Sequence, residues 1–226
     1  MWMYIDYEPV AAFGLRPSNT TSNGGKSLIS PTPYAVKMAI LDRIIRLHGL
    51  AVGKKLFPIL RDSPIFLRLP LAISVNRTFQ KVLRGYDRKT RQWTSTIVQR
   101  EYVFYAGRFS LALPAPDGND FRLLLEGFAA INYFGRRGSF FQMVDYSILE
   151  DAPKRQSGFI NASQQSTDIV VGFLQRMDDM ESWAEFADVS IFSSKANGAR
   201  RSYTVIFPYM VDHHGMNHTI YLRSKS

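Results

Sequence analysis

Cysteine is absent from the 226 residues of this chain. Its absence excludes disulfide bonds, thiolate catalysis and cysteine-based zinc sites. Long apolar runs are also missing, since no stretch approaches the roughly 20 apolar residues that a membrane helix needs. The opening residues, Met1 to Glu8, lack the basic region of a secretory signal. We therefore expect a cytoplasmic protein with no membrane partner, and no residue pattern in the chain calls for a cofactor.

Acidic residues are scarce relative to basic ones. The chain has 28 Lys and Arg against 19 Asp and Glu, which gives a formal net charge of +9 and a pI of about 9.8. Hydrophobic residues make up 46% of the chain, enough to build a folded core. A positive excess of this size favours a polyanionic partner. A pI above about 9 is an early indication that this polyanion is a nucleic acid.

The segment from Tyr133 to Gln142 places two adjacent arginines between two glycines, with aromatic residues on both sides. The residues are Gly135, Arg136, Arg137 and Gly138, flanked by Phe134, Phe140 and Phe141. Glycine permits backbone angles that other residues avoid and lets a second backbone come close. Paired guanidinium groups suit phosphate oxygens. The segment therefore predicts a phosphate-binding turn whose aromatics are core or stack on bases; the alternative is a tight turn with two solvated arginines.

A second basic segment runs over residues 76–100 and contains one acid, Asp87. Its cations are Arg77, Lys81, Arg84, Arg88, Lys89, Arg91 and Arg100. The polar composition indicates a hairpin or loop that projects from the core and carries Tyr86 and Trp93. Trp93 either stacks on a base or packs back to anchor the hairpin. For Arg100, a surface ion pair with the adjacent Glu101 is the alternative to a phosphate contact.

The order of the expected elements indicates the fold class. The chain reads as a strand at 4–9, a polar loop at 17–30, a helix at 34–47 ended by Gly49, a strand at 64–75, the basic hairpin, strands at 98–105 and 108–113, a helix at 121–131 and a strand at 139–148. Strand–helix–strand–strand–helix–strand is the ferredoxin-like arrangement. We therefore expect an α+β fold with a ferredoxin-like domain over residues 1–150, and a smaller, mostly β part over residues 151–226.

Four segments in this order resemble one known family. They are the first strand with its Gly/Ser loop, the helix entry Pro31-Thr32-Pro33, Gln99-Arg100-Glu101-Tyr102-Val103 before Gly107-Arg108-Phe109-Ser110-Leu111, and the second helix running into Tyr133-Phe134-Gly135-Arg136-Arg137-Gly138. Together they resemble the Cas-five family, a subunit of type I CRISPR effector (Cascade) complexes. The resemblance covers about residues 1–150. It implies the RRM-like core of the RAMP superfamily, with residues 76–100 as its basic thumb.

The resemblance also implies a function in prokaryotic antiviral defence. Members of this family bind the 5′ handle of the guide RNA and cap the filament of backbone subunits. The implied partners are the guide RNA, the backbone subunits and the large subunit, with target DNA as a further candidate. The residues we expect to bind RNA are Lys26, Arg77, Lys81, Arg84, Arg88, Lys89, Arg91, Trp93, Arg100, Gly135, Arg136, Arg137, Gly138 and Phe140.

Some relatives cut the guide precursor and resemble one another in using a tyrosine, a lysine and a histidine near the thumb. Here no histidine lies between His48 and His213, so we expect no catalytic residue and no enzyme. A metal-independent endoribonuclease of the same superfamily remains the alternative, and a generic RNA-recognition module outside CRISPR is a third hypothesis. The cluster at His213, His214 and His218 reads as a polar turn between strands rather than a metal site.

Overall fold

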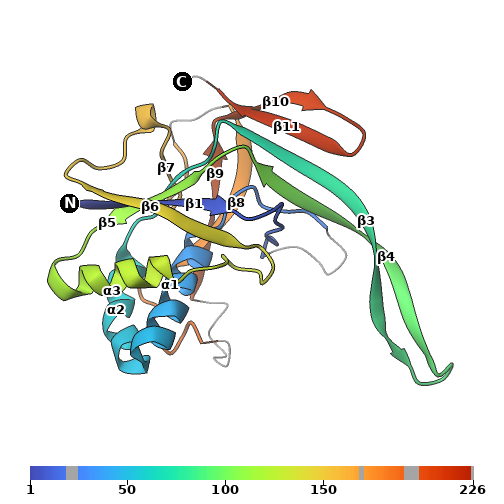
Figure 1. The fold of residues 1–226 in the computed structure, drawn as a ribbon, viewed down its shortest axis with the longest axis horizontal. Helices are drawn as coiled ribbons and strands as arrows, with labels where there is room; N and C mark the ends of the chain where they lie inside the picture. Colours follow the sequence, from blue (N-terminus) through green and yellow to red (C-terminus); the bar gives the residue numbers. More distant parts are fainter. Residues whose placement is uncertain (19–24, 168–170, 191–198, 225–226) are drawn as a thin grey trace.

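The computed structural model describes residues 1–18, 25–167, 171–190 and 199–224 (Figure 1). Its centre is a five-stranded sheet with the order β6-β1-β5-β2-β7, and every neighbouring pair in it is antiparallel. The strands are β1 (Trp2–Pro9), β2 (Phe66–Arg68), β5 (Phe109–Pro114), β6 (Phe141–Leu149) and β7 (Ile160–Asn161).

Three helices lie together on one side of this sheet (Figure 1), and they are α1 (Pro33–His48), α2 (Leu50–Asp62) and α3 (Gly118–Ala129). Along the chain, β1, α1, β2, β5, α3 and β6 follow one another in the ferredoxin-like sequence of elements. In the sheet, the first of these strands lies between the last and the third. The fold class predicted from the sequence, α+β with a ferredoxin-like core, is confirmed. No helix in the described part of the chain is long and apolar enough to cross a membrane.

The first helix forms where the sequence signals place it. The Thr32 side chain accepts a hydrogen bond from the Ala35 amide, and Pro33 occupies the first turn, where it needs no amide partner. Gly49 ends the helix with φ 86°, a left-handed value that favours glycine. The side chains spaced four residues apart on one face, Val36, Ile40 and Ile44, are fully buried.

The sequence reading missed α2, which starts directly after Gly49. Pro58 stands inside this helix, and a proline in a helical pattern normally indicates an end. The helix forms because Leu56, Phe57 and Leu60 are buried against the core, so tertiary packing outweighs the local signal. The prediction of a single strand at 64–75 is also wrong, because residues 69–71 separate two strands, β2 and β3.

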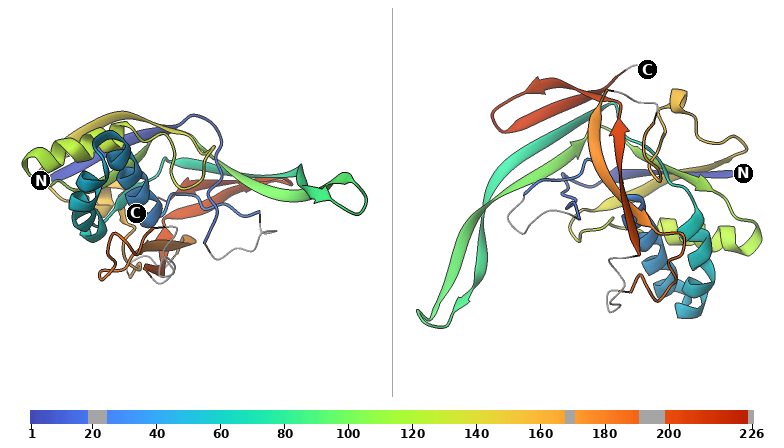
Figure 2. Two further views of the ribbon diagram at one scale, coloured as in Figure 1. Left: turned by 90° about the horizontal axis from the view of Figure 1, so that it is seen from below. Right: turned by 180° about the vertical axis from the view of Figure 1, so that it is seen from behind.

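A long hairpin projects from the body, as Figures 1 and 2 show. Its strands are β3 (Ala72–Asp87) and β4 (Gln92–Tyr105), paired from Ile73 opposite Tyr105 to Asp87 opposite Gln92. We call its outer part, residues 77–100, the finger. The predicted basic hairpin at 76–100 is therefore present as a hairpin. Strands β10 (Tyr209–His214) and β11 (His218–Arg223) extend the sheet at its base, in the order β10-β11-β3-β4.

The residues after 150 are mostly β, but they are built into the rest of the molecule. Strand β7 pairs with β2 in the central sheet, and β11 pairs with β3. The two-stranded sheet of β8 (Phe173–Met180) and β9 (Arg200–Phe207) contributes buried side chains to the same hydrophobic cluster as β1 and α1. Within the mostly β part expected over residues 151–226, residues 168–170, 191–198 and 225–226 lie outside the described residues. In the loop expected at 17–30, the described residues 28–30 are buried.

A buried ion pair joins α1 to β8. The Lys37 Nζ atom lies 2.7 Å from Asp179 Oδ1 and donates to the Arg61 carbonyl at 2.9 Å. The side chains are 1% and 0% exposed. The Arg201 guanidinium reaches the other Asp179 oxygen at 3.5 Å. Burial lowers the pKa of Lys37, and the Asp179 carboxylate opposes that shift, so the charge on Lys37 depends on its partner.

Removing one partner of this pair should destabilise the protein strongly. Asp179→Ala would leave the Lys37 ammonium buried without its counter-charge, which costs about 3–5 kcal/mol. Urea unfolding measures the change in the free energy of unfolding. The matched control is Asp151→Ala, which breaks the exposed pair of Asp151 with Lys154 at 3.3 Å and should cost less than about 1 kcal/mol. Equal effects for the two variants would contradict the structural importance of the buried pair.

Candidate nucleic-acid interface

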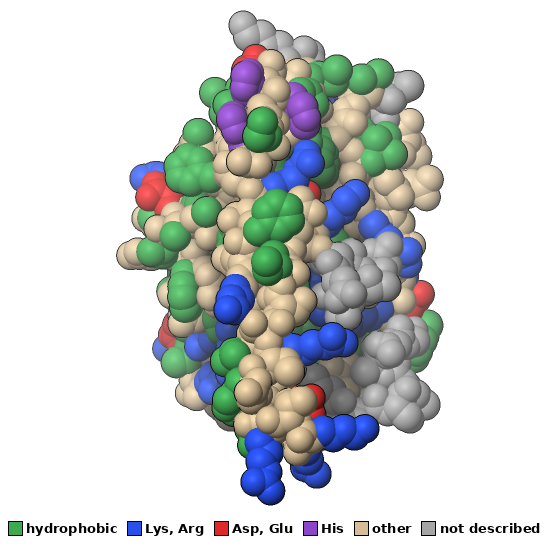
Figure 3. Space-filling view, turned by 90° about the vertical axis from the view of Figure 1, so that its right-hand side faces the viewer, with side chains coloured by type: hydrophobic (Ala, Val, Ile, Leu, Met, Phe, Trp, Pro, Cys, Tyr) green, Lys and Arg blue, Asp and Glu red, His purple; other side chains and the backbone are tan. Residues whose placement is uncertain are grey.

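The finger carries most of the predicted cations away from the core. Beyond Asn76 no residue of β3 is buried, and the same is true of β4 before Val103. The register shift between Leu83 and Gly85 places Arg84 in a bulge. Arg88, Lys89 and Arg91 form the tip, where Arg91 adopts a φ of 53°. Figure 3 views this side and shows Lys and Arg side chains spread over the finger and around it, with few acidic ones.

The single acidic residue of the finger, Asp87, is hydrogen-bonded within the turn at the tip. The Asp87 carboxylate accepts hydrogen bonds from the amides of Lys89, at 2.8 Å, and Thr90, at 3.5 Å. These bonds, the Lys89 amide first, lower the pKa of Asp87. Within the described residues, no ion pair involves any of the cations Lys81, Arg84, Arg88, Lys89 and Arg91. They are therefore available to a polyanion.

One face of the finger is apolar. Residues 93, 95 and 97 alternate along β4 and lie opposite Tyr86, Leu83 and Lys81, so all of these side chains share a face. The large apolar members of this row, all at least half exposed, are Phe79, Leu83, Tyr86, Trp93 and Ile97. Trp93 is 66% exposed and meets Tyr86 edge-to-face at 5.6 Å. It therefore pairs across the hairpin and does not pack back on the core, which excludes the anchoring alternative and leaves the stacking prediction open.

The turn at Gly135–Gly138 is exposed, as predicted, and its two glycines adopt left-handed φ values of 66° and 95°. The Ser139 amide closes the turn on the Arg136 carbonyl at 3.2 Å, and the Ser139 hydroxyl donates to the Gly14 carbonyl at 2.9 Å. Within the described residues, Arg136 and Arg137 make no side-chain hydrogen bond or ion pair. Their guanidinium groups are therefore free to bind an anion.

The aromatics beside this turn divide between core and surface. Phe134 is fully buried and Phe141 is nearly so, and their rings meet edge-to-face at 5.3 Å. Phe134 also contacts the ring of Tyr7 at 5.1 Å. Phe140 is 51% exposed. Phe134 and Phe141 are therefore core, and only Phe140 keeps the predicted option of stacking on a base.

A groove of 780 Å³ brings the two predicted basic segments together. Arg100, at the base of the finger, and Gly135 and Arg136, from the turn, line the same groove. Arginines from four other segments lie among the apolar residues of the lining, and they are Arg16, Arg43, Arg176 and Arg200. The two acids of the lining are Asp42 and Asp178. The groove is therefore strongly positive and wide enough for a nucleotide-sized ligand.

Both acids of the groove are already engaged. Asp42 pairs with Arg43 at 3.5 Å and with Arg46 at 2.9 Å, and Asp178 accepts the Ser202 hydroxyl at 2.7 Å. The guanidinium of Arg200 lies 4.0 Å from the centre of the Tyr34 ring, which holds it in place.

Three arginines of the lining remain open to an anion. Arg100, Arg136 and Arg176 make no ion pair and no side-chain hydrogen bond with the described residues.

The sequence reading missed four of the arginines in this groove: Arg16, Arg43, Arg176 and Arg200. They come from four separate segments, and no glycine or aromatic pattern like that at 133–142 marks any of them, although Arg200 is followed by Arg201. Arg43 is one cation among several on α1, for example, and Arg176 lies on β8. Only the tertiary structure places them together.

The remaining predicted residues lie at the base of the finger. Lys26 is exposed, in a segment that pairs with β4 through the bond from the Glu101 amide to the Gly25 carbonyl at 2.7 Å. Arg77 lies 4.0 Å from the Glu101 carboxylate, which also accepts the Ser27 amide at 3.0 Å. The predicted alternative for Arg100, an ion pair with Glu101, is therefore wrong, because Glu101 engages Arg77 and Ser27 instead.

The four histidines lie at two separate places in the fold. His213 and His218 stack across the β10–β11 hairpin at 5.3 Å, and His214 contacts the Thr219 hydroxyl at 2.9 Å. In the part of the chain that the structure describes, no group of three potential metal ligands converges. His48 lies 2.9 Å from the Glu126 carboxylate, between the ends of α1 and α3.

Comparison with known proteins gives structural neighbours only. No family model matches the chain, and no curated protein matches it. Among solved structures it is similar to a CRISPR protein from Archaeoglobus fulgidus, with 13% identity over 99% of this chain and 92% of that one, at a TM-score of 0.41. It is also similar to a chain of a CRISPR RNA-guided surveillance complex, with 11% identity over 62% of this chain and 59% of that one, at a TM-score of 0.40. Likenesses at this level do not identify binding residues.

Phe134 is core and the two arginines are exposed, so substitutions at these positions should differ strongly in their effect on the free energy of unfolding. Phe134→Ala empties a site inside the aromatic core and should cost about 3–5 kcal/mol. Arg136→Ala and Arg137→Ala remove exposed side chains without protein partners and should change the free energy of unfolding by less than about 0.5 kcal/mol. Thermal or urea unfolding of the three variants measures this. If the arginine variants are strongly destabilised, the pair is structural rather than a binding element.

Proposed function

We propose that the chain is a non-enzymatic RNA-binding subunit of a CRISPR RNA-guided complex. In that complex it holds the 5′ handle of the guide RNA and ends the filament of backbone subunits. One observation carries the proposal: the base of the finger and the Gly135–Gly138 turn line one groove, together with arginines from four other segments. The ferredoxin-like order of the sheet and the resemblance of the sequence to the Cas-five family support the same function.

The groove suits the backbone of a single strand. Guanidinium groups bind phosphate oxygens with two parallel hydrogen bonds, and Arg100, Arg136 and Arg176 have no competing partner within the described residues. The left-handed glycines of the turn expose backbone near Arg136 without a side chain in the way. An added Cβ at Gly138 would have nothing within 4 Å, so the space beside it is open to a ligand.

The finger suits contacts with both phosphates and bases. Its tip and bulge carry unpaired cations, and its apolar face exposes Tyr86 and Trp93. Aromatic rings next to basic side chains are the usual composition of surfaces that bind single-stranded nucleic acid. The exposed Phe140 adds a further ring beside the turn.

The proposal of no enzymatic activity rests on the positions of the histidines. None lies on the finger, and His48 is engaged with Glu126 at the ends of two helices. A general acid or base must reach the bond that it helps to cleave. No described side-chain arrangement favours the endoribonuclease alternative.

The finger should contribute a measurable share of the salt dependence of RNA binding. Each phosphate contact on a single strand adds a slope of about −0.7 to log affinity against log salt. Replacing Arg84, Arg88 and Lys89 with alanine should therefore flatten the slope by roughly two units. The control replaces Lys54, Arg122 and Lys154 with alanine, which removes the same charge from other elements. An equal change in both triple variants would show that only net charge matters.

The groove should contribute affinity through single contacts. Arg136→Ala should weaken guide-RNA binding by roughly 1.5–3 kcal/mol, because a charge-assisted hydrogen bond is lost. Gly138→Val should weaken it as well, since valine is strained at the φ of 95° and its side chain would enter the open space beside the turn. Fluorescence anisotropy with a labelled handle RNA measures both. Normal affinity in both variants, with normal melting, would exclude the groove as the handle site.

The purified protein should leave repeat RNA intact, with or without divalent metal ions. Gel analysis of end-labelled RNA after prolonged incubation tests this, with RNA alone as the control. Cleavage at one phosphodiester bond, if His48→Ala abolishes it, would contradict the proposal of a non-enzymatic subunit and favour the endoribonuclease alternative.

A further inference from the structure

Strand β6 forms one end of the central sheet and, among the strands of the described residues, pairs with β1 alone. A strand at the end of a sheet presents unpaired amide and carbonyl groups along its outer edge. Natural proteins usually protect such edges with lysine or proline. The sequence of β6 is FQMVDYSIL, which contains neither, although the whole chain has 28 Lys and Arg. The strand carries two other protective features, the charge of Asp145 and the β-bulge beside it. Beyond the bulge, Asp145 is the one charged residue of this edge.

The two faces of β6 differ in chemistry. Tyr146 and Ile148 lie opposite the buried residues Ile5 and Met3, on the helical side of the sheet, yet are 47% and 41% exposed. Asp145, Ser147 and Leu149 lie opposite Asp6, Tyr4 and Trp2 and face the other side. A strand added to this edge would therefore meet apolar side chains on one face and mostly polar ones on the other.

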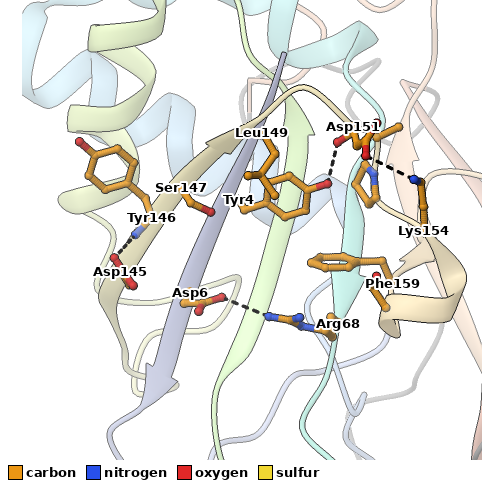
Figure 4. Close-up of a pocket in the computed structure, with 13 residues that line it drawn as sticks. Tyr4, Asp6, Arg68, Asp145, Tyr146, Ser147, Leu149, Asp151, Lys154 and Phe159 are labelled. Atoms are coloured by element: carbon orange, nitrogen blue, oxygen red, sulfur yellow. Dashed lines mark hydrogen bonds and ion pairs between the residues drawn. The ribbon is translucent and has the colours of Figure 1, made fainter.

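A cavity of 370 Å³ adjoins the polar face (Figure 4). It lies over β1 and β2, with Tyr4 and Phe159 meeting edge-to-face at 5.4 Å in its wall. Its charged lining consists of Asp6, Asp145 and Asp151 against Arg68 and Lys154. The lining thus carries one more negative than positive charge, in a chain whose net charge is +9. The cavity therefore favours a cationic group and disfavours phosphate.

Two of the three carboxylates already have cationic partners. Asp6 accepts the Ser110 hydroxyl at 2.5 Å and lies 3.9 Å from Arg68. Asp151 pairs with Lys154 at 3.3 Å.

The third carboxylate, Asp145, makes no ion pair with the described residues. It accepts only the amide of Tyr146, at 2.8 Å. An incoming carbonyl could take over that amide and release the carboxylate to a new cation.

We propose that the edge of β6 receives an extended segment of a partner protein in which apolar and basic side chains alternate. The segment adds a strand to the sheet by backbone hydrogen bonds, a common mode of peptide recognition. Its apolar side chains pack on Tyr146 and Ile148. Its Lys or Arg side chains turn to the opposite face, where Asp145 and the acidic cavity receive them. This surface is distinct from the arginine groove. It receives a positively charged partner, whereas the groove receives a polyanion.

The test uses a labelled peptide in which lysine and valine alternate, titrated into the full chain. Binding by anisotropy, with slowed hydrogen exchange at the amides of residues 142–149, is the expected result. Asp145→Lys should weaken the affinity roughly tenfold. The control is Glu185→Lys, an equal charge change at an exposed acid without an ion pair in the described residues, which should bind like the natural protein. A peptide that alternates glutamate and valine should prefer the Asp145→Lys variant.

Three results would overturn the proposal. Equal affinity of the lysine peptide for the natural protein and for Asp145→Lys would show that Asp145 does not attract the basic side chains of the segment. Slowed hydrogen exchange confined to amides outside β6 would show that the peptide does not bind at this strand edge. Single-stranded RNA that protects the β6 amides would assign this surface to RNA. Guide-RNA affinity of Asp145→Lys should be unchanged, so this test is independent of the RNA-binding proposal.

Discussion

The buried contact between Lys37 and Asp179 is the interaction on which the arginine-lined groove depends. A charge inside a protein core is tolerated only with a partner, so the two residues hold α1 and β8 together. The groove is lined from these same elements and from β9, which carry Arg43, Arg176 and Arg200. The ion pair thus fixes a C-terminal strand against the N-terminal helix and brings distant arginines to one wall. Part of the function of the residues after 150 is therefore to complete a surface that begins in the ferredoxin-like core.

Two basic elements leave the core in different ways. The finger is a long hairpin whose outer residues contact one another but are not buried in the core, so its sequence is free to carry cations and exposed aromatics. The turn at Gly135–Gly138, by contrast, is anchored on both sides, by Phe134 and Phe141 in the aromatic core. A rigid turn and an extended hairpin meeting at one groove suit the capture of a flexible strand, because the rigid part fixes the position while the hairpin extends the contact.

The molecule separates its two kinds of charge. Positive side chains gather on the finger and in the groove, whereas β6 and the adjacent cavity carry the acids Asp6, Asp145 and Asp151. Under the two proposals made above, RNA in the groove and a basic protein segment at β6 would occupy different surfaces and would not compete. The difference in balance is large for the groove, which has six arginines against two acids, and small for the cavity, which has three acids against Arg68 and Lys154.

The sequence by itself determined what local pattern and charge can specify. The cap at Thr32, the end at Gly49, the projecting basic hairpin and the order of the ferredoxin-like elements are all readable, since each depends on neighbours along the chain. The tertiary structure alone decided that α2 forms despite Pro58, and that Phe134 is core while Phe140 is exposed. It alone also gathered the groove, because contacts between residues far apart in the chain depend on how the layers pack. The residues next to an arginine in the sequence do not show which distant residues it will meet.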